Sequence, residues 1–599
     1  MEVIMKKMET NFRRYSTEIF WIFFLIVLSP ALIATVMYQN TTFEGSGQMA
    51  TGKVLGERVQ NTTEEYLEGR DNNITIPEAE SEVLGRETQN LTAKEARGQS
   101  ITAPDIGLKN ASFARLTNVS NTSYANEHNR IHSDKLLDGL VASGFEKVSC
   151  ISRFDSYLYR KASPHKPSQY LISKLRNYED LHRKCGVHTK AYKRTMVKLV
   201  RSKNHNAGTV CKYLVWTPVN GLGNRMISMA AAFLYALVTD RVLLVEFQSD
   251  MVDLFCEPFP NSTWILPKDF PFRNKYAHIE TYQNMLKKDK GNGSKEIVPS
   301  VMHLNMQHTF NDPKKLFHCN HSQDLLQQVS LLILQSDQYF VPSLFMTPSF
   351  NPELNKMFLK KDTVFHHLGR YLFHPSNEAW GLISRFYQTY LANADERIGL
   401  QIRVFRPDHT PHQRVMELLL SCTLKNKLLP ELDKQNFITS ISKNQTLKVV
   451  LLASLYRVYG DNLRTMYLSE PTVTGEMIGV CQPSHEEHQK FHDNRHNMMA
   501  WTEIYLLSMS DTLVTTSLST FGYVAQGLGG LKPWLLYRIV GNETHNPACE
   551  RDISMEPCFH IPPKYNCEGK AMEHLGLLYP HMRKCVDYSS GIKLINDSN

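Results

Sequence analysis

Two apolar runs on either side of a glycine loop constrain the fold of this chain more than any other feature. Lys212–Trp216 predicts a short buried strand, and Gly221 and Gly223 follow it in a tight turn. The alanine-rich stretch Met226–Val238 then predicts a closely packed helix, and Val242–Glu246 a second strand. A strand, a helix and a strand in this order form a parallel βαβ unit, with the loop at the carboxyl end of its first strand. The chain is therefore expected to be an α/β protein.

A second α/β set follows further along the chain. Its expected strands are Arg397–Phe405, Leu447–Leu452 and Thr512–Thr516, and its expected helices are Thr502–Ser510 and one from Tyr523 that stops at Gly529-Gly530. A chain of 599 residues is too long for one hydrophobic core. We predict two Rossmann-like domains facing a cleft, residues 131–390 and 391–545, and then a cysteine-rich segment, residues 546–599.

The N-terminus predicts a membrane anchor. Ile19–Tyr38 is uncharged and about as long as a helix that crosses a bilayer. Four cations precede it, at Lys6, Lys7, Arg13 and Arg14, which predicts a cytosolic tail, residues 1–18, and a lumenal remainder. A cleaved signal peptide is the alternative, because Ala31 and Ala34 suit a cleavage site, but the run is longer than the apolar core of a signal peptide.

The next stretch, residues 39–130, predicts a disordered glycosylated stem. Leu, Ile, Val and Phe number only sixteen over residues 41–130, too few to offset the chain entropy of folding. Crowded N-x-Ser/Thr sequons in this stretch indicate the secretory pathway. The thirteen sequons are Asn40, Asn61, Asn73, Asn90, Asn110, Asn118, Asn121, Asn261, Asn292, Asn320, Asn444, Asn542 and Asn596.

The eleven cysteines all lie at or after Cys150, in the part expected to fold. An odd number leaves one thiol unpaired unless a bridge joins two chains. Cys549, Cys558, Cys567 and Cys585 contain no C-x-x-C pair, so in an oxidising lumen disulfides fit them better than zinc. We expect all four to be oxidised, with at least some paired among themselves.

Two motifs are candidates for binding an anion. Arg403 lies in an apolar strand, where a buried guanidinium needs either a phosphate or an internal carboxylate. The turn from Ser517 to Tyr523 offers hydroxyls and N–H groups at a helix N-terminus, where they suit a diphosphate or simply cap the helix. The Gly221–Arg225 loop is equally compatible with a structural turn or a ligand loop.

Several chemistries are disfavoured. No P-loop and no G-x-S-x-G elbow occurs. His485-Glu-Glu-His488 lacks the H-E-x-x-H spacing of a zinc site and is more typical of a solvated loop, so no metal is expected. The net charge of +8 is spread over the chain without a dense basic tract, which argues against nucleic-acid binding.

Eight blocks, in order over about residues 205–590, resemble the plant xyloglucan-type (alpha-1,2) fucosyltransferase family. Leu518 and Cys481 depart from the family pattern without removing a polar candidate. The blocks are Trp216–Arg225, Cys256–Trp264, Ser336–Phe345, Val364–Pro375, Arg397–Phe405, Gln482–Glu487, Ser519–Gly530 and Ser554–His560.

The resemblance implies a GT-B architecture and a metal-independent, inverting transfer of L-fucose from GDP-fucose, without a cofactor. It implies as acceptor a galactose hydroxyl, commonly O2, on a wall polysaccharide or glycoprotein such as xyloglucan or arabinogalactan protein. It further implies a type II Golgi membrane protein with a lumenal catalytic domain, and a homodimer is left open.

The resemblance also suggests roles for particular residues. Asp337 is the candidate base or acceptor-orienting carboxylate, and Arg403 the candidate cation for the leaving GDP. Further donor-binding candidates are Asn224, Arg225, His485, Ser519, Thr520 and Tyr523.

Two other function classes stay open on the residues alone. An oxidoreductase could hold NAD at Gly221–Arg225 with Glu246 on the ribose, although the third glycine of the fingerprint is missing. A glycan-binding protein without turnover is the second alternative.

Overall fold

The computed structural model describes residues 136–201, 209–289, 298–307, 316–435, 445–539, 546–572 and 575–596. All of them belong to one compact unit, Ala114–Asn599. The predicted tail, anchor and stem all lie outside them, as do ten of the thirteen sequons; Asn261, Asn320 and Asn596 are described. Within the described part of the chain, no helix has the length and apolar character needed to cross a membrane.

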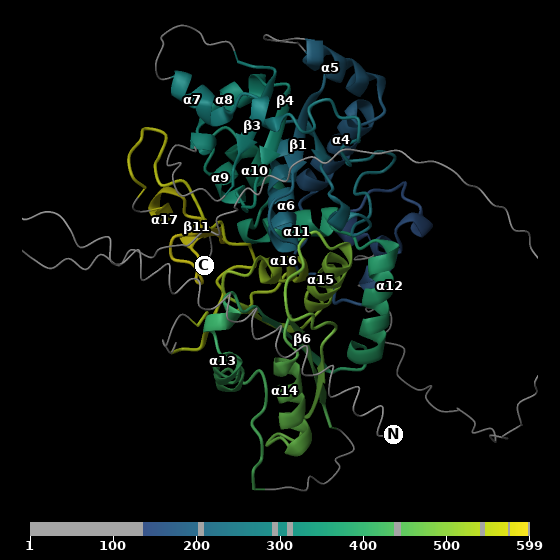
Figure 1. The fold of residues 1–599 in the computed structure, drawn as a ribbon, viewed down its shortest axis with the longest axis vertical. Helices are drawn as coiled ribbons and strands as arrows, with labels where there is room; N and C mark the ends of the chain where they lie inside the picture. Colours follow the sequence, from purple (N-terminus) through teal and green to yellow (C-terminus); the bar gives the residue numbers. More distant parts are fainter. Residues whose placement is uncertain are drawn as a thin grey trace, which may run out of the picture. The chain divides into compact units, whose positions relative to one another are not determined.

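The first sheet contains four parallel strands in the order β2-β1-β4-β3. Figure 1 labels β1, β3 and β4 of this sheet. Alternate side chains of its strands enter two different cores, because successive residues of a strand point to opposite faces. Leu214 and Trp216 pack with helix α6, whereas Tyr213 and Val215 pack with α4 and α5. The strands are β1 (Lys212–Thr217), β2 (Arg241–Val245), β3 (Val301–Asn305) and β4 (Leu331–Gln335).

The second sheet has six strands in the order β10-β9-β8-β5-β6-β7, and only β10 is antiparallel. Val450 and Leu452 of β6 face α13 and α14, and Val449 and Leu451 face the core that contains α15 and α16. The strands are β5 (Glu396–Ile402), β6 (Leu447–Ser454), β7 (Met477–Cys481), β8 (Thr512–Thr516), β9 (Trp534–Leu536) and β10 (Cys549–Arg551). The α/β class is confirmed, and β10 extends this sheet past the predicted boundary at residue 545.

Most helices lie on the faces of the two sheets. Helix α6 is buried almost all round, as expected of a helix that is apolar on every side. The helices are α3 (Ile151–Asp155), α4 (Gln169–Cys185), α5 (Lys190–Arg201), α6 (Leu222–Val238), α7 (Tyr282–Asp289), α8 (Asn320–Gln328), α9 (Val341–Phe345), α10 (Asn351–Met357), α11 (Val364–Leu372), α12 (Asn377–Phe386), α13 (His412–Lys425), α14 (Val458–Ser469), α15 (Asn494–Leu507), α16 (Thr520–Gly529) and α17 (Leu575–Leu578).

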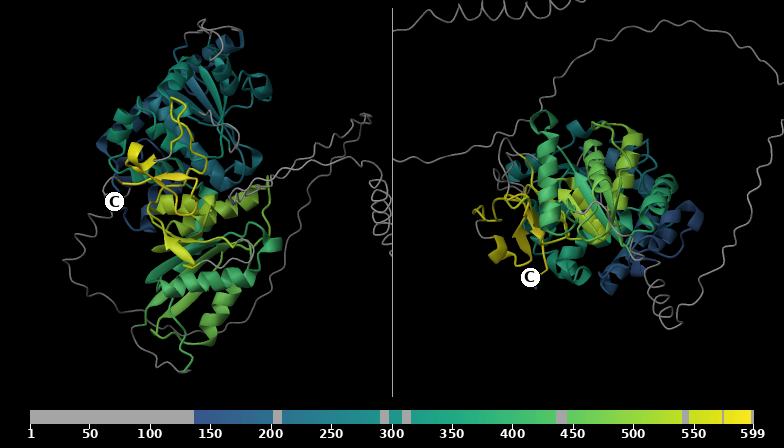
Figure 2. Two further views of the ribbon diagram at one scale, coloured as in Figure 1. Left: turned by 90° about the vertical axis from the view of Figure 1, so that its left-hand side faces the viewer. Right: turned by 90° about the horizontal axis from the view of Figure 1, so that it is seen from below.

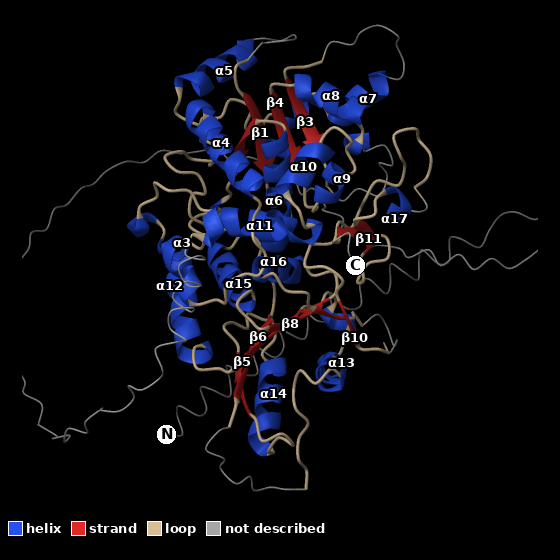
Figure 3. Ribbon diagram, turned by 180° about the vertical axis from the view of Figure 1, so that it is seen from behind, coloured by secondary structure: helices blue, strands red, loops and turns tan. Residues whose placement is uncertain are grey.

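Helices α6, α11 and α16 pack against one another between the two sheets (Figure 3). Gly223, in the first turn of α6, lies against the start of α16. A Cβ atom added at Gly223 would lie 2.7 Å from Thr520 Oγ1 and 2.8 Å from the main-chain nitrogen of Phe521. The sequence left a structural turn and a ligand loop equally open for Gly221–Arg225, and at Gly223 the neighbouring helix takes up the space that a side chain would need.

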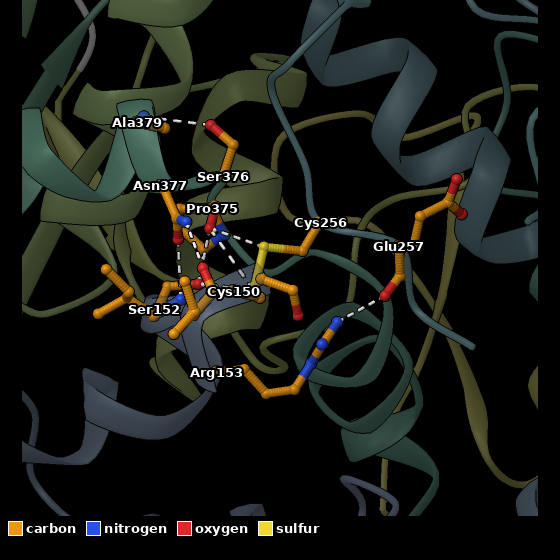
Figure 4. The surroundings of a disulfide bond; sticks show 12 residues. Cys150, Ser152, Arg153, Cys256, Glu257, Pro375, Ser376, Asn377 and Ala379 are labelled. Carbon is orange, nitrogen blue, oxygen red and sulfur yellow. Dashed lines mark hydrogen bonds between the residues drawn. A yellow bond between two sulfur atoms is a disulfide. The ribbon is translucent and has the colours of Figure 1, made fainter. Parts of the chain in front are cut away.

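Five disulfides cross-link the chain, three of them over more than 100 residues. Cys150–Cys256 ties the residue before α3 to the segment that follows β2. Beside this bridge, Ser152 Oγ donates a hydrogen bond to the Pro375 carbonyl over 2.6 Å, and Figure 4 draws this contact. The other four are Cys185–Cys211, Cys319–Cys567, Cys422–Cys549 and Cys558–Cys585. The four C-terminal cysteines are thus oxidised as predicted, with one pair among themselves, and Cys481 is the buried free thiol.

The C-terminal segment, yellow in Figure 2, lies alongside elements of both sheets. It contains the two-stranded sheet of β11 (Met582–Lys584) and β12 (Ile592–Leu594). Glu556 accepts hydrogen bonds from Tyr339 Oη (2.5 Å) and from the Phe365 N–H (2.7 Å). Lys593 and Asp552 form an ion pair at 2.5 Å with both side chains fully buried. The segment is therefore part of the packed protein rather than an appended tail.

Candidate functional site

A cavity of about 460 Å³ opens at the carboxyl ends of the strands of the second sheet. Its other side is closed by the loop between β1 and α6, which belongs to the part of the protein built on the first sheet (the first half). In open α/β sheets this edge is where ligands bind. The lining residues are Asn220–Asn224, Asp337, Gln338, Gln401–Arg403, Phe405, Ala453–Leu455, Ser484, Gln489, Phe491, His496, Asn497, Met499, Ala500, Glu503, Leu518–Phe521 and His560.

Arg403 follows the last residue of β5 and lines this cavity. Its main-chain N–H donates to Thr516 Oγ1 (3.0 Å), and its Nη2 donates to Gln489 Oε1 (2.7 Å). Burial lowers the pKa of Arg403 from its ordinary value. Among the described residues no carboxylate forms an ion pair with it, so the internal salt bridge that sequence reasoning left open is not what holds this guanidinium. A largely dehydrated cation facing a cavity favours an anionic ligand.

The N-terminus of α16 faces the same cavity. Its N-cap residue Ser519 makes no side-chain capping bond, and the Ser517 hydroxyl donates instead to the Leu536 carbonyl at 3.0 Å. Leu518 adopts a positive φ of 63°, which turns the chain sharply into the helix. The capping account of these hydroxyls therefore does not describe this turn, and the helix N-terminus suits an anion in the cavity.

Asn224 and Thr520 join the two halves across the cavity wall. Thr520 Oγ1 donates to Asn224 Oδ1 at 2.5 Å. Both were predicted from the sequence as donor-binding residues. The structure places them side by side, so a ligand at the start of α16 would touch both halves of the protein.

Asp337 lies just beyond the end of β4 and is 6% exposed. Its Oδ2 accepts from Asn220 Nδ2 (2.8 Å), and its Oδ1 accepts from Gln338 Nε2 (3.1 Å). Asn220 itself has a positive φ of 60° in the loop before α6. Two amide donors therefore fix the orientation of this carboxylate within the cavity wall.

Three predicted donor-binding residues do not line the cavity. Arg225 is buried, and its Nη1 donates to both oxygens of Asp250 at 2.9 Å, while its Nε donates to the Asn220 carbonyl. This buried pair holds the loop that carries Asn220, and removing one partner of such a pair typically costs about 3–5 kcal/mol. His485 is exposed outside the cavity.

Tyr523 is the third. It is 1% exposed, and its hydroxyl donates to Asp587 Oδ2 at 2.5 Å and lies 3.1 Å from His560 Nε2. Burial, and then the Asp587 carboxylate, raise the pKa of Tyr523 well above its usual value. Asp587 also accepts from the Leu518 N–H at 2.9 Å. Tyr523 therefore supports the Leu518 turn from behind and does not line the cavity.

Sequence reasoning missed several lining residues, among them Glu503 and Gln489. Glu503 is a single acid in the apolar half of α15, the same signal that singled out Arg403 in its strand. Gln489 comes from a polar loop whose sequence gives no such signal. Two clusters of potential metal ligands occur in the described chain, but each contains disulfide-bonded cysteines, whose sulfurs are not thiolates.

Known proteins resemble this chain over most of its length. A family model described as xyloglucan fucosyltransferase matches residues 110–568. Over 470 residues the chain is 50% identical to the galactoside 2-alpha-L-fucosyltransferase of Pisum sativum, covering 78% of this chain and 83% of the relative. It is 51% identical over 470 residues to the protein of the same name from Arabidopsis thaliana, covering 78% and 84%.

A solved structure extends this similarity to three dimensions. It is the structure of a mutant of Arabidopsis thaliana FUT1 in complex with GDP. The match has a TM-score of 0.72 at 50% identity and covers 77% of this chain and 100% of the solved chain.

Proposed function

Because this chain belongs to the xyloglucan fucosyltransferase family, we propose that it transfers L-fucose from GDP-fucose to a galactose hydroxyl of a plant cell-wall glycan. The relatives named as galactoside 2-alpha-L-fucosyltransferases support O2 as the hydroxyl. The observation that carries the proposal is the half-buried Arg403, which faces a cavity beside a helix N-terminus without a carboxylate partner among the described residues. GDP, which is bound in the solved structure of the relative, is an anion of the kind that this cation would bind.

The two sheets with the cavity at their shared side support a GT-B architecture. In the proposed reaction the bond between fucose C1 and the β-phosphate oxygen breaks, and GDP leaves with the bonding electron pair. Arg403 and the N–H groups at the start of α16 stabilise the negative charge that develops on the diphosphate. We propose that these groups serve in place of a metal ion and that no cofactor is needed.

Asp337 suits the acceptor side of the reaction. Its carboxylate, held by Asn220 and Gln338, lies on the wall contributed by the first half. There it accepts the proton of the attacking galactose hydroxyl, while attack from the face opposite GDP inverts the configuration at C1. The hydrogen-bonded pair Asn224 and Thr520 lies between the proposed acceptor side and the proposed donor side of the cavity.

We also propose that the protein is a single-pass type II protein of the Golgi membrane with its catalytic part in the lumen. The apolar run Ile19–Tyr38, the cations before it and the sequons after it support this orientation. Five disulfides are consistent with an oxidising compartment. In sealed microsomes a protease should leave the catalytic part intact until detergent is added.

The decisive experiment measures GDP release from GDP-fucose by the purified full-length chain, with and without fucose-free xyloglucan or arabinogalactan protein. We expect slow hydrolysis alone, faster GDP release with an acceptor, and alpha-linked fucose in the product. A dehydrogenase or a glycan-binding protein without turnover would release no GDP. Loss of activity in EDTA, restored by manganese, would contradict the metal-independent mechanism.

A further inference from the structure

Glu503 is a buried carboxyl group in the cavity wall to which the proposed reaction gives no role. It projects from α15, lines the cavity and is only 6% exposed. Its Oε1 accepts a hydrogen bond from the Ser484 hydroxyl at 2.7 Å. No cation forms an ion pair with it in the described chain. A carboxyl group in such a dry place needs further donors when it is ionised.

The position of Glu503 follows from the strand order. The strands β8, β5, β6 and β7 are neighbours, and their carboxyl ends carry Ser519, Arg403, Ala453–Leu455 and Ser484 in that order. Neighbouring strands lie about 4.8 Å apart, so Ser484 is about 10 Å along the edge from Arg403. A nucleotide with its diphosphate at Arg403 and Ser519 therefore extends its nucleoside toward Ser484 and Glu503.

The side chains around Glu503 suit a flat base. Leu455, Met499 and Ala500 line the same part of the cavity and provide apolar surface. Guanine presents two adjacent donors on one edge, N1–H and the exocyclic amino group, and a carboxylate presents two acceptors. Adenine offers an acceptor at N1 and no amino group at C2. We infer that Glu503 accepts hydrogen bonds from the guanine N1–H and amino group and so selects a guanine nucleotide; the inference rests on the proposed function.

The electrostatics agree with this geometry. The pKa of Glu503 is raised to about 8, chiefly by burial and also by the nearby Glu486, while hydrogen bonding from Ser484 acts against the rise. Two ligand N–H donors would favour the ionised carboxylate in the same way as the hydrogen bonding from Ser484 does. Ser484 fixes the rotamer of Glu503 in advance, which lowers the ordering cost of binding.

The test compares nucleotide binding by the full-length chain and by Glu503→Gln, using calorimetry with GDP, IDP, 2′-deoxy-GDP and ADP. IDP lacks the amino group, so the wild type should bind it at least about tenfold more weakly than GDP, and ADP more weakly still. Glutamine keeps the shape but replaces one acceptor with a donor, so Glu503→Gln should lose at least about tenfold in GDP affinity and most of the preference for GDP over IDP. Glu556→Gln is the matched control, because Glu556 is also buried, has a pKa raised to about 8 and lies outside the cavity.

The outcomes separate this inference from the proposed function. If the wild type binds none of the nucleotides, the proposed function itself fails. If it binds GDP and IDP equally, or if Glu503→Gln keeps full GDP preference, the function stands and the guanine assignment is overturned. If the variant instead loses the preference for GDP over 2′-deoxy-GDP, Glu503 reads the ribose and the assignment is also overturned. The wild-type comparison of GDP with IDP decides the matter even if the variant does not fold.

Discussion

Replacing Gly223 by alanine tests whether the two halves of this protein meet as closely as the structure shows. The added Cβ would lie 2.7 Å from Thr520 Oγ1 and 2.8 Å from both the Phe521 nitrogen and the Thr520 carbonyl carbon, whereas ordinary contact begins at 3.4 Å. Two of these three atoms belong to the main chain, so a side-chain rotation cannot relieve the clash. The starts of α6 and α16 must therefore separate by about 0.7 Å.

This separation has a cost in both stability and catalysis. Overpacking typically lowers the free energy of unfolding by about 1–3 kcal/mol, and the better helix propensity of alanine offsets up to about 1 kcal/mol of it. The separation would stretch the hydrogen bond between Thr520 and Asn224 and displace the N–H groups that are proposed to bind the diphosphate. Since a misplacement of about 1 Å can cost about a hundredfold in rate, we expect kcat/KM to fall by at least about tenfold.

The assay measures thermal unfolding and GDP-fucose turnover for Gly223→Ala beside Gly221→Ala. A Cβ at Gly221 would meet only the side-chain nitrogen of Gln489, at 3.1 Å, and that flexible group can move. Gly221→Ala should therefore stay close to the wild type in stability. A Gly223→Ala protein with wild-type unfolding and wild-type kcat/KM would refute the close approach of the two helices.

Three further predictions concern charged side chains. Arg403→Lys keeps the charge but loses the planar fork, so kcat/KM should fall about a hundredfold; normal GDP affinity and turnover in Arg403→Ala would make this arginine structural. Asp337→Asn should slow transfer by at least about a hundredfold while calorimetry shows unchanged GDP binding, and near-normal transfer would remove Asp337 from the mechanism. Burial raises the pKa of Glu556 to about 8, so the folded state holds its proton more tightly than the unfolded state and stability falls as pH rises from about 4.5 to 8. Glu556→Gln should flatten that fall in urea unfolding, and an unchanged pH slope would count against a neutral Glu556.

Strands β1, β2, β5, β6 and β8 were predicted from the sequence, and Arg403 and the turn before α16 were singled out as anion-binding candidates, because their signals are local. The run Thr512–Thr516 was predicted with the bounds that β8 has in the structure. Arg403 was singled out because a lone cation in an apolar strand needs an anionic partner. Turn residues such as Ser519 and Thr520 reach the cavity simply because they follow a parallel strand.

The side chains that differ from expectation take their roles from distant partners. Arg225 sits in the same loop as Asn224, but Asp250 captures its guanidinium and turns it away from the cavity. Tyr523 is held by Asp587, which comes 64 residues later. No local sequence pattern around Arg225 or Tyr523 predicts that Asp250 or Asp587 will be its partner. Glu503 did carry a local signal, which was overlooked because its helix was read only for its apolar pattern.

The bridge between Cys319 and Cys567 has a consequence for biosynthesis. The two cysteines are 248 residues apart, so at about 5–20 residues per second Cys319 waits roughly 12–50 s for its partner to be translated. Cys185–Cys211 spans only 26 residues and can close long before. The same late segment brings His560 into the cavity wall and Asp587 behind the Leu518 turn. A nascent chain therefore cannot complete this cavity until residues 560–587 have been made, however early its first sheet has folded.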